Sequence, residues 1–341
     1  MKKTLLASAI AAVTFSGGAL AQTTASASEL AARMDSMPTV YGNIQYVVAY
    51  DDFDGESNNI AHQDNGSTIG IQHEHSFAPG LTGFFKVELE GLAADDKDQE
   101  SGLEDLDEAY IGIKGDSFGQ LWVGSDDSMY ETSVEQISLF YERGDLNRFV
   151  SYDTGEGDLI QYKSPSLGGL TLGGAVQING DGEDDQSLDD KNNKKSYPFQ
   201  LAAMYEVDAL ELAVAVDSND SGTNVNNENT YGLRSSFNLD NLRLTAEYHT
   251  RKDVEDTYGV QGIYALGSNQ FALSYEVTDQ DFGAENKIDV VTLQALHNLS
   301  DHMYIYFEGL VASDDESSFT PGGTVSVDRQ TQANVGAVYY F

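Results

Sequence analysis

The sequence of 341 residues contains no cysteine and only 5 proline residues. The lack of cysteine excludes a secreted scaffold held together by disulfides. After residue 21 no apolar stretch reaches 18 residues, so that part of the chain has no candidate transmembrane helix. Basic residues are also scarce, because 18 Lys and Arg stand against 56 Asp and Glu, for a net charge of −38. Such an acidic chain repels phosphates, and we expect no nucleic-acid partner.

The first 21 residues have the pattern of a cleaved secretory signal peptide. Lys2 and Lys3 precede an apolar run from Leu5 to Val13, and Ala19-Leu20-Ala21 is an A-x-A cleavage site. The apolar run is too short to span a membrane, and a buried N-terminal helix is the alternative. The pattern predicts export from the cytoplasm.

Residues 22–38 differ from the rest of the mature chain. Ser28 is placed to cap a short helix that would end before Pro38. We interpret this segment as a periplasmic leader, with a tether or plug as the alternative.

From residue 39 to residue 341 the chain reads as short strands of alternating character. Phe85, Val87 and Leu89 alternate with Lys86 and Glu88, as expected where one strand face meets lipid and the other meets water. Tight turns rich in Gly, Pro, Asn, Asp and Ser separate the strands near 77–81, 115–119, 164–169, 207–210, 238–241, 267–269 and 298–301. Longer polar segments lie near 51–66, 92–104, 126–157, 179–197, 219–228, 251–256, 279–286 and 313–327. This alternation predicts a closed antiparallel transmembrane β-barrel of about sixteen strands, give or take two, with short periplasmic turns and long extracellular loops.

The last seven residues support closure of the barrel. Val335, Ala337, Tyr339 and Phe341 fall on one face of a strand that continues to the final residue. Chain ends usually fray, so an ordered terminal strand indicates an edge that must be paired. We expect it to pair with the first strand, near residues 41–50. An ordinary last strand in a large secreted acidic all-β domain is the alternative.

Several local motifs, in this order, resemble the trimeric general diffusion porins of Gram-negative bacteria over residues 39–341. The motifs are Val40-Tyr41-Gly42-Asn43-Ile44, Asp107-Glu108-Ala109-Tyr110-Ile111-Gly112-Ile113-Lys114-Gly115, Phe118-Gly119-Gln120-Leu121-Trp122-Val123-Gly124, Gln161-Tyr162-Lys163-Ser164-Pro165 and the terminal Tyr339-x-Phe341.

This resemblance implies a homotrimer of sixteen-stranded barrels in the outer membrane, through which small hydrophilic solutes and ions diffuse passively. It also implies that the third long loop folds into each lumen as a constriction. Tyr339 and Phe341 would form the signal read by the barrel assembly machinery. Outer-membrane lipid and lipopolysaccharide are expected partners, with divalent cations bridging loop carboxylates to lipopolysaccharide phosphates.

The third long segment, 126–157, is the expected constriction loop, and its charged residues are mostly acidic. They are Asp126, Asp127, Glu131, Glu135, Glu142, Asp145, Asp153 and Glu156, against Arg143 and Arg148. In the family such acids face a ladder of basic wall residues, but this sequence departs from that pattern. Thr68, Glu108 and Ser125 stand where basic residues are common, Glu88 adds a further acid, and Lys86 and Lys163 are the wall cations that alternation places inward.

A pore lined mostly by carboxylates should concentrate cations, so we predict a cation-preferring pore. The alternative is that most acids lie on outer loops, where salt screens them beyond about 10 Å at 0.1 M. A substrate-selective channel of the same fold is the second functional candidate.

Other constellations predict no cofactor, metal site or catalytic centre. Asp51-x-x-Asp54 and Asp181-Gly182-Glu183-Asp184 lack the spacing of a calcium-binding EF-hand loop. His73 and His75 share one strand face without a third ligand nearby in the sequence. No Gly-x-Ser-x-Gly motif is present, so we expect neither a hydrolase nor, given the porin-like motifs, an adhesin.

Overall fold

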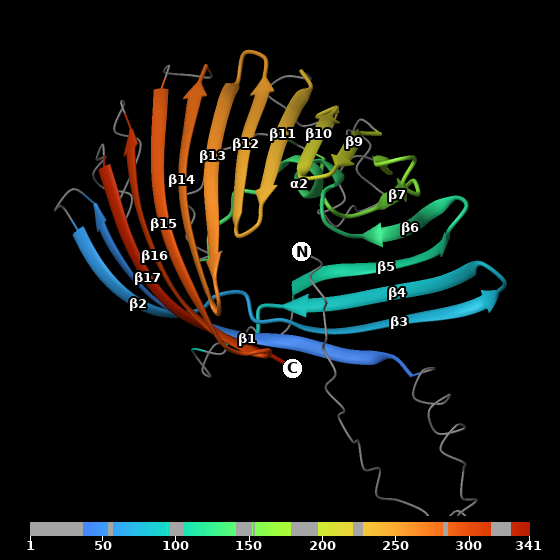
Figure 1. Cartoon of the computed structure of the whole chain (residues 1–341), viewed down its shortest axis with the longest axis horizontal. Coiled ribbons are helices and arrows are strands. Elements are labelled where there is room, and N and C mark those ends of the chain that lie inside the picture. Colours follow the sequence, from blue (N-terminus) through green and yellow to red (C-terminus); the bar gives the residue numbers. More distant parts are fainter. Residues whose placement is uncertain are drawn as a thin grey trace, which may run out of the picture.

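The strands form one antiparallel sheet that closes on itself into a barrel (Figure 1). The computed structural model describes residues 37–53, 57–93, 95, 105–140, 152, 154–178, 197–220, 228–281, 286–314 and 329–341. The strands in this part of the chain are β1 (Thr39–Phe53), β2 (Ser57–Asp64), β3 (Ile69–Ala78), β4 (Leu81–Glu90), β5 (Asp105–Gly115), β6 (Gly119–Ser125), β7 (Leu159–Lys163), β8 (Leu170–Gln177), β9 (Phe199–Val207), β10 (Leu210–Asp217), β11 (Thr230–Leu239), β12 (Leu242–Arg251), β13 (Glu255–Leu266), β14 (Asn269–Gln280), β15 (Asn286–Ser300), β16 (Met303–Asp314) and β17 (Arg329–Tyr340).

β2 and β3 together occupy one position in the wall. β2 pairs with the second half of β1, over Tyr46–Phe53, and β3 pairs with its first four residues. Between them the chain bends, because the Asp64 carboxylate accepts hydrogen bonds from the backbone N–H groups of Gly66 and Ser67 at 3.1 and 2.8 Å. Counted by wall position the barrel has sixteen strands, which confirms the predicted fold class.

All seven predicted tight turns separate consecutive strands, but two predicted long segments are wrong in their extent. Most of 51–66 is strand, because β1 continues to Phe53 and β2 fills Ser57–Asp64. Its polar side chains predict a loop. A strand that extends to the rim of a barrel, however, can carry polar side chains on both faces. The segment 251–256 is likewise a short turn, because β12 ends at Arg251 and β13 begins at Glu255.

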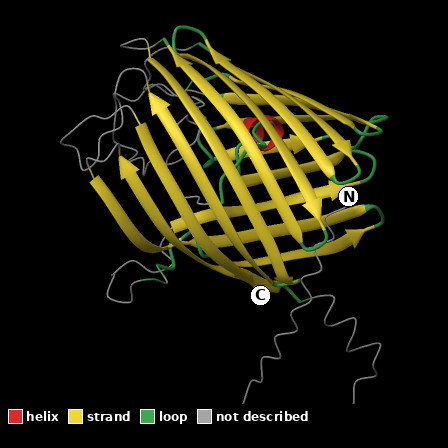
Figure 2. Cartoon of the chain, turned by 60° about the vertical axis from the view of Figure 1, so that its left-hand side comes forward, coloured by secondary structure: helices red, strands yellow, loops and turns green. Residues whose placement is uncertain are grey.

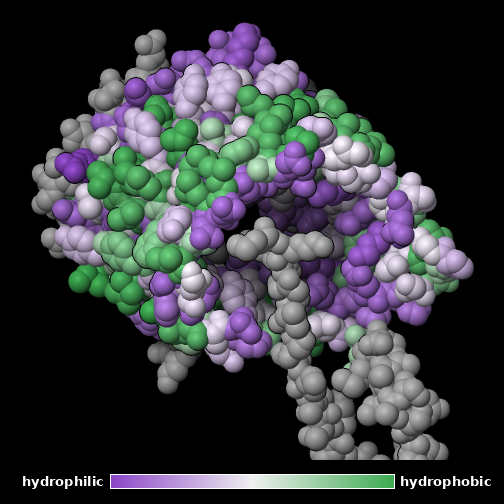
Figure 3. Space-filling view, viewed as in Figure 1, coloured by the Kyte–Doolittle hydropathy of each residue, from purple (hydrophilic) through white to green (hydrophobic). Residues whose placement is uncertain are grey.

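Alternation along the strands separates an apolar outer wall from a polar interior. Leu244, Val260 and Leu273 are exposed on the outside, whereas their neighbours Thr245 and Gln261 are buried inside. Figure 3 shows the hollow of the barrel surrounded by hydrophilic residues, with hydrophobic residues over the outer flank. An apolar outer belt around a polar lumen is the arrangement of a barrel that spans a lipid bilayer.

The C-terminal residue completes the closure, as the sequence predicts. β17 pairs with β1 from Asn43 opposite Tyr340 onward. Beyond this ladder, the Gly42 N–H donates to the Phe341 carbonyl at 3.2 Å, and the Phe341 N–H donates to the Gly42 carbonyl at 3.0 Å. A Cβ on Gly42 would lie 2.7 Å from the Phe341 ring, so glycine makes room for the terminal side chain.

One short helix, α2 (Met129–Val134), lies inside the barrel (Figure 2). Within the described ranges, no helix is both long and apolar enough to cross a membrane. The predicted signal peptide, 1–21, and nearly all of the predicted leader, 22–38, lie outside the described residues. The first strand begins at Thr39, where the barrel domain is predicted to start.

Candidate pore constriction

Residues 126–140 leave the end of β6 and run along the inner wall of the barrel. At the base of this segment, the Asp126 N–H donates to the Glu156 carbonyl at 3.1 Å, which joins the outgoing and returning chain. Ser128 caps helix α2, because its hydroxyl accepts from the Glu131 N–H at 3.2 Å and from the Gln200 side chain at 2.9 Å. The helix is therefore fixed at its start to the wall strand β9.

Wall side chains then hold the segment at successive points around the barrel. The Arg234 guanidinium on β11 donates to the Ser133 carbonyl at 3.0 Å. The Glu247 carboxylate on β12 accepts from the Gln136 N–H at 2.6 Å. The Tyr130 hydroxyl lies 2.7 Å from Nδ1 of the buried His249, also on β12. The segment is therefore bound to inward side chains of β11 and β12.

The far end of the segment is fixed between β15, β16 and the bend that precedes β3. Gln294 donates to the Ser138 carbonyl at 2.9 Å, and Glu308 accepts from the Phe140 N–H at 2.7 Å. The Asn65 amide donates to the Phe140 carbonyl at 2.7 Å. The Phe140 ring also packs on Tyr306, with ring centroids 5.0 Å apart. The segment thus follows the inner wall from β6 to β16.

The wall of β4 and β5 carries the charges that this segment leaves facing the lumen. Lys86 forms an ion pair with Glu108 and lies 3.5 Å from Glu88. The Lys86 ammonium also lies over the Tyr41 ring, 5.7 Å from its centroid. Lys86, Glu88, Tyr41, Thr68 and other residues line a cavity of about 1000 Å³ that extends to the rim of short turns. One cation between two carboxylates leaves this wall with an excess of negative charge.

The first residues of the segment add carboxylates beside this wall. Asp126 accepts from the Trp122 indole N–H at 2.6 Å and from the Gln161 amide at 3.2 Å. Burial raises the pKa of Asp126 above its ordinary value, although the bond from Trp122 opposes that shift, and the neighbouring charge of Asp127 adds to it. This carboxyl therefore takes up a proton more readily than an exposed aspartate does.

The structure brings together some of the predicted site residues and leaves others apart. Lys86, Glu88 and Glu108 form one cluster, and Thr68 lies in the bend beside it, accepting from the Asn43 amide at 3.0 Å. Lys163 lies elsewhere, at the end of β7, where it shares a recess at the short-turn rim with Lys114. Ser125 is the last residue of β6 and pairs with Ala109.

Beside Asp126 and Asp127, the predicted loop acids Glu131, Glu135 and Glu156 belong to the described part. Glu131 accepts from the Tyr152 hydroxyl at 2.8 Å, and burial raises the pKa of that tyrosine, reinforced by the Glu131 charge. The backbone N–H of Glu135 donates to the Glu131 carbonyl at 2.9 Å and ends the helix. Five predicted loop residues lie outside the described residues: Glu142, Arg143, Asp145, Arg148 and Asp153.

Sequence reasoning missed the wall residues that hold the segment, namely Asn65, Arg234, Glu308 and Gln294. Alternation signals their inward direction, because Leu233 and Phe307 beside two of them are exposed outside. Their partners are more than 70 residues away in the chain, and no local pattern identifies them. Arg234 also bonds Glu211 at 3.1 Å, so this inward cation is already engaged by an acid.

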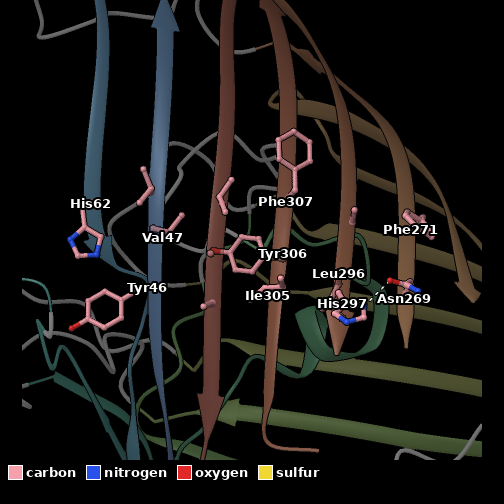
Figure 4. Close-up of a pocket in the computed structure, with 15 residues that line it drawn as sticks. Tyr46, Val47, His62, Asn269, Phe271, Leu296, His297, Ile305, Tyr306 and Phe307 are labelled. Atoms are coloured by element: carbon pink, nitrogen blue, oxygen red, sulfur yellow. Dashed lines mark hydrogen bonds between the residues drawn. The ribbon is translucent and has the colours of Figure 1, made fainter. Parts of the chain in front are cut away.

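The structure offers no further candidate site of comparable chemistry in its described part. His73 and His75 share the outer face of β3 with ring centroids 6.3 Å apart, and no group of three His, Asp or Glu among the described residues could hold a metal ion. A second concave patch lies on the wall across β1, β2 and β14–β17. There Tyr46 stacks on His62, and His297 bonds Asn269 at 2.8 Å (Figure 4).

Comparisons with known proteins give concordant matches. The model of the Gram-negative porin family matches residues 7–317 of the chain. A "Monosaccharide porin" of Halomonas sp. and the "Major outer membrane protein" of Halomonas elongata are each 30% identical over 312 residues, covering 86% of this chain and 75% of the relative.

Solved structures match with lower sequence identity. Salmonella typhi OmpF in complex with daunomycin is 16% identical, with a TM-score of 0.65 over 90% of this chain and 99% of that one. Vibrio cholerae OmpT in its trimer form is 14% identical, with a TM-score of 0.62 over 89% of this chain and 99% of that one. At such identities the likeness shows a shared barrel fold.

Proposed function

Because the chain belongs to the Gram-negative porin family, we propose that it is an outer-membrane pore for passive diffusion of small hydrophilic solutes and ions, with a preference for cations. The family and the closed barrel support the diffusion channel itself. The cation preference rests on one observation, the cluster in which Lys86 lies between Glu88 and Glu108, near the start of the loop that carries Asp126. A narrow aqueous passage beside excess carboxylates raises the local concentration of cations and lowers that of anions.

The pairing of the inward arginines with an acid also supports a preference for cations. Arg234 and Arg243 face the interior, and both bond the single acid Glu211, at 3.1 and 2.8 Å. They are therefore poorly placed to attract anions. The competing view, in which outer-loop acids are screened beyond about 10 Å at 0.1 M salt, does not apply to wall carboxylates inside the barrel.

Reversal potentials across a planar bilayer under a KCl gradient test the proposed preference. We expect the sign that corresponds to K⁺ being more permeant than Cl⁻, and a smaller effect at high salt because screening increases. A reversal potential that favours anions would contradict the cation preference but not the proposed diffusion channel.

A substrate-selective channel is the second candidate, and one finding favours it. The Halomonas relative is called a monosaccharide porin, and Tyr41 and Tyr110 beside the lumen carboxylates resemble the aromatic and polar mixture that binds sugars. Liposome swelling with sugars, amino acids and organic anions of graded size distinguishes the two. Rates ordered by size support general diffusion, and one outlying fast solute supports selectivity.

We also propose a homotrimer. OmpT of Vibrio cholerae, which shares the fold, is described in a trimer form. In this chain, His73 and His75 face outward from β3 beside Phe77, Phe85 and Ile111, in the apolar belt. Two imidazoles are better accommodated against protein than against hydrocarbon. Single-channel currents that close in three equal steps would support the trimer, and single steps would contradict it.

The remaining proposals concern export and surroundings. Residues 1–21 act as a cleaved signal peptide, residues 22–38 as a periplasmic leader, and Tyr339 and Phe341 as the signal read by the barrel assembly machinery. Lipopolysaccharide would contact the outer loops through divalent cations. Membership of a channel family supports transport rather than catalysis. N-terminal sequencing of the mature protein tests the cleavage after Ala21.

A further inference from the structure

Three glycines on the inner wall lie where side chains of the constriction segment dock. Gly173 of β8, Gly232 of β11 and Gly259 of β13 face inward, because their neighbours Leu172, Tyr231 and Val260 are exposed outside. The docked side chains follow one another in the same order as the strands they meet. They are Met129 at Gly173, Tyr130 and Val134 at Gly232, and Ile137 at Gly259.

The contacts at these glycines are so close that an added Cβ would force the docked side chain to shift. A Cβ on Gly173 would lie 2.6 Å from the Met129 sulfur. On Gly232 it would lie 2.6 Å from Val134 Cγ2 and 2.7 Å from the Tyr130 hydroxyl. On Gly259 it would lie 2.8 Å from Ile137 Cδ1. The docked side chains are almost completely buried, including Tyr130 and Val134 at 0% exposure.

Backbone conformation does not require glycine at these three positions. The glycines with positive φ in the described part are others, such as Gly80 and Gly267 in the short turns. Any residue could therefore adopt the strand conformation of Gly173, Gly232 or Gly259, and the requirement is space for the incoming side chain.

We propose that Gly173, Gly232 and Gly259 are sockets that seat residues 129–137 against the wall and so set the width of the passage. This inference rests on the proposed pore function and deepens it, because it names positioning residues for the constriction. The hydrogen bond from Arg234 to the Ser133 carbonyl and the bond from the Gln136 N–H to Glu247 fix where along the wall the segment lies. The sockets fix how far it projects into the lumen, since helix α2 lies between the wall and the open interior (Figure 2).

Gly232 is the most informative socket to fill. The atoms around it belong to a β-branched valine and a tyrosine ring, which have little freedom to turn aside. Met129 and Ile137 present the ends of more flexible side chains at the other two sockets. An added methyl group at Gly232 must therefore displace helix α2 away from the wall, and only the lumen offers space.

The test uses Gly232→Ala in the full-length protein, with Gly262→Ala as the matched control. Gly262 is also a strand glycine, but it faces outward, where the exposed Leu244 would be in ordinary contact with its added Cβ, 3.5 Å from Cδ2. It therefore controls for the loss of a strand glycine that does not touch the constriction segment. We expect Gly232→Ala to lower single-channel conductance, and to lower the ratio of disaccharide to monosaccharide swelling rates by about twofold, because permeation near the size limit depends steeply on pore width. Gly262→Ala should leave both quantities unchanged.

A compensating substitution separates seating from general damage. Val134→Ala removes the Cγ2 methyl group that lies 2.6 Å from the added Cβ but leaves the Tyr130 hydroxyl at 2.7 Å, so the double variant should recover part of the wild-type ratio. A ratio that is unchanged or raised in Gly232→Ala, or no higher in the double variant than in Gly232→Ala alone, would overturn the inference. If Gly232→Ala yields no folded protein, Gly259→Ala with and without Ile137→Ala gives the same comparison. Absence of any conductance in the wild type would instead overturn the pore itself.

Discussion

Glu308 should act as a latch for the far end of the constriction segment, and Glu308→Ala should release it. The Glu308 carboxylate is completely buried and accepts from the Phe140 N–H at 2.7 Å, from Gln294 at 2.8 Å and from Asn334 at 3.2 Å. Alanine would remove all three acceptor contacts. The Phe140 N–H, which belongs to the segment, would then have no acceptor from β16.

The magnitude follows from that lost contact. Leaving a buried donor without an acceptor costs about 2 kcal/mol. Since each 1.4 kcal/mol is a factor of ten, the released state should become roughly thirty times more populated. The Asn65 bond to the Phe140 carbonyl and the Phe140–Tyr306 contact still hold the tip, so release should be transient rather than permanent. Open-channel current noise should rise, and larger neutral sugars should enter liposomes faster.

Glu308→Gln is the matched control, because it removes the charge but retains an acceptor. Its amide oxygen can still accept from the Phe140 N–H, while its NH₂ group takes the place of the oxygen that accepts from the Asn334 amide. Asn334 can turn its side chain so that Oδ1, which has no partner in the described structure, accepts that hydrogen. We expect the glutamine variant to match the wild type in noise and sugar permeation. Equal effects of glutamine and alanine, or none from alanine, would refute the latch.

Further predictions concern charge, protonation, the loop contact and the terminus. Glu108→Gln should weaken the cation preference measured from reversal potentials, because it removes a carboxylate that pairs with Lys86. An unchanged reversal potential would show that Glu108 does not contribute to the selectivity. Because burial raises the pKa of Asp126, this carboxylate should be neutralised at a higher pH than an exposed aspartate when the pH is lowered. The cation preference measured from reversal potentials should begin to fall at that pH, and Asp126→Asn should remove this part of the pH profile. Tyr130→Phe should lower the free energy of unfolding by about 1 kcal/mol through loss of the bond to His249, measured by denaturant titration. Deleting Phe341 should reduce the yield of inserted barrel while leaving the conductance of inserted channels unchanged.

Much of the fold follows from local patterns in the sequence. The seven tight turns predict the strand count, and the alternation around residues such as Lys86 and Glu88 predicts the inward face of the strands that contain them. A period of two is a strong signal in a barrel, because one face of every strand must suit lipid. It fails at residues 51–66, where β1 and β2 extend and polar residues are tolerated on both faces.

The candidate site is less predictable, because its contacts join distant parts of the chain. The acidic character of 126–157 is visible in the sequence, and so is the shortage of wall cations. The sequence does not show that Arg234 meets Glu211 and Ser133, or that Asn65 meets Phe140. The sockets at Gly232 and similar positions are hidden for the same reason, since a strand glycine has several possible explanations until the side chain packed against it is known.

Five acids of the interior fall into two groups with different partners, and we expect this difference to bear on selectivity. Glu247 and Glu308 accept backbone N–H groups of the constriction segment, and Glu211 binds two arginines. These three carboxylates hold the pore together, and their charges are partly offset by the donors around them. Glu88 and Glu108 share a single lysine and line the opposite wall. The net charge of −38 is therefore a poor guide to the field in the passage. We expect that field to depend strongly on the carboxylates of β4 and β5, so substitutions there should change ion preference more than equal substitutions in the outer loops.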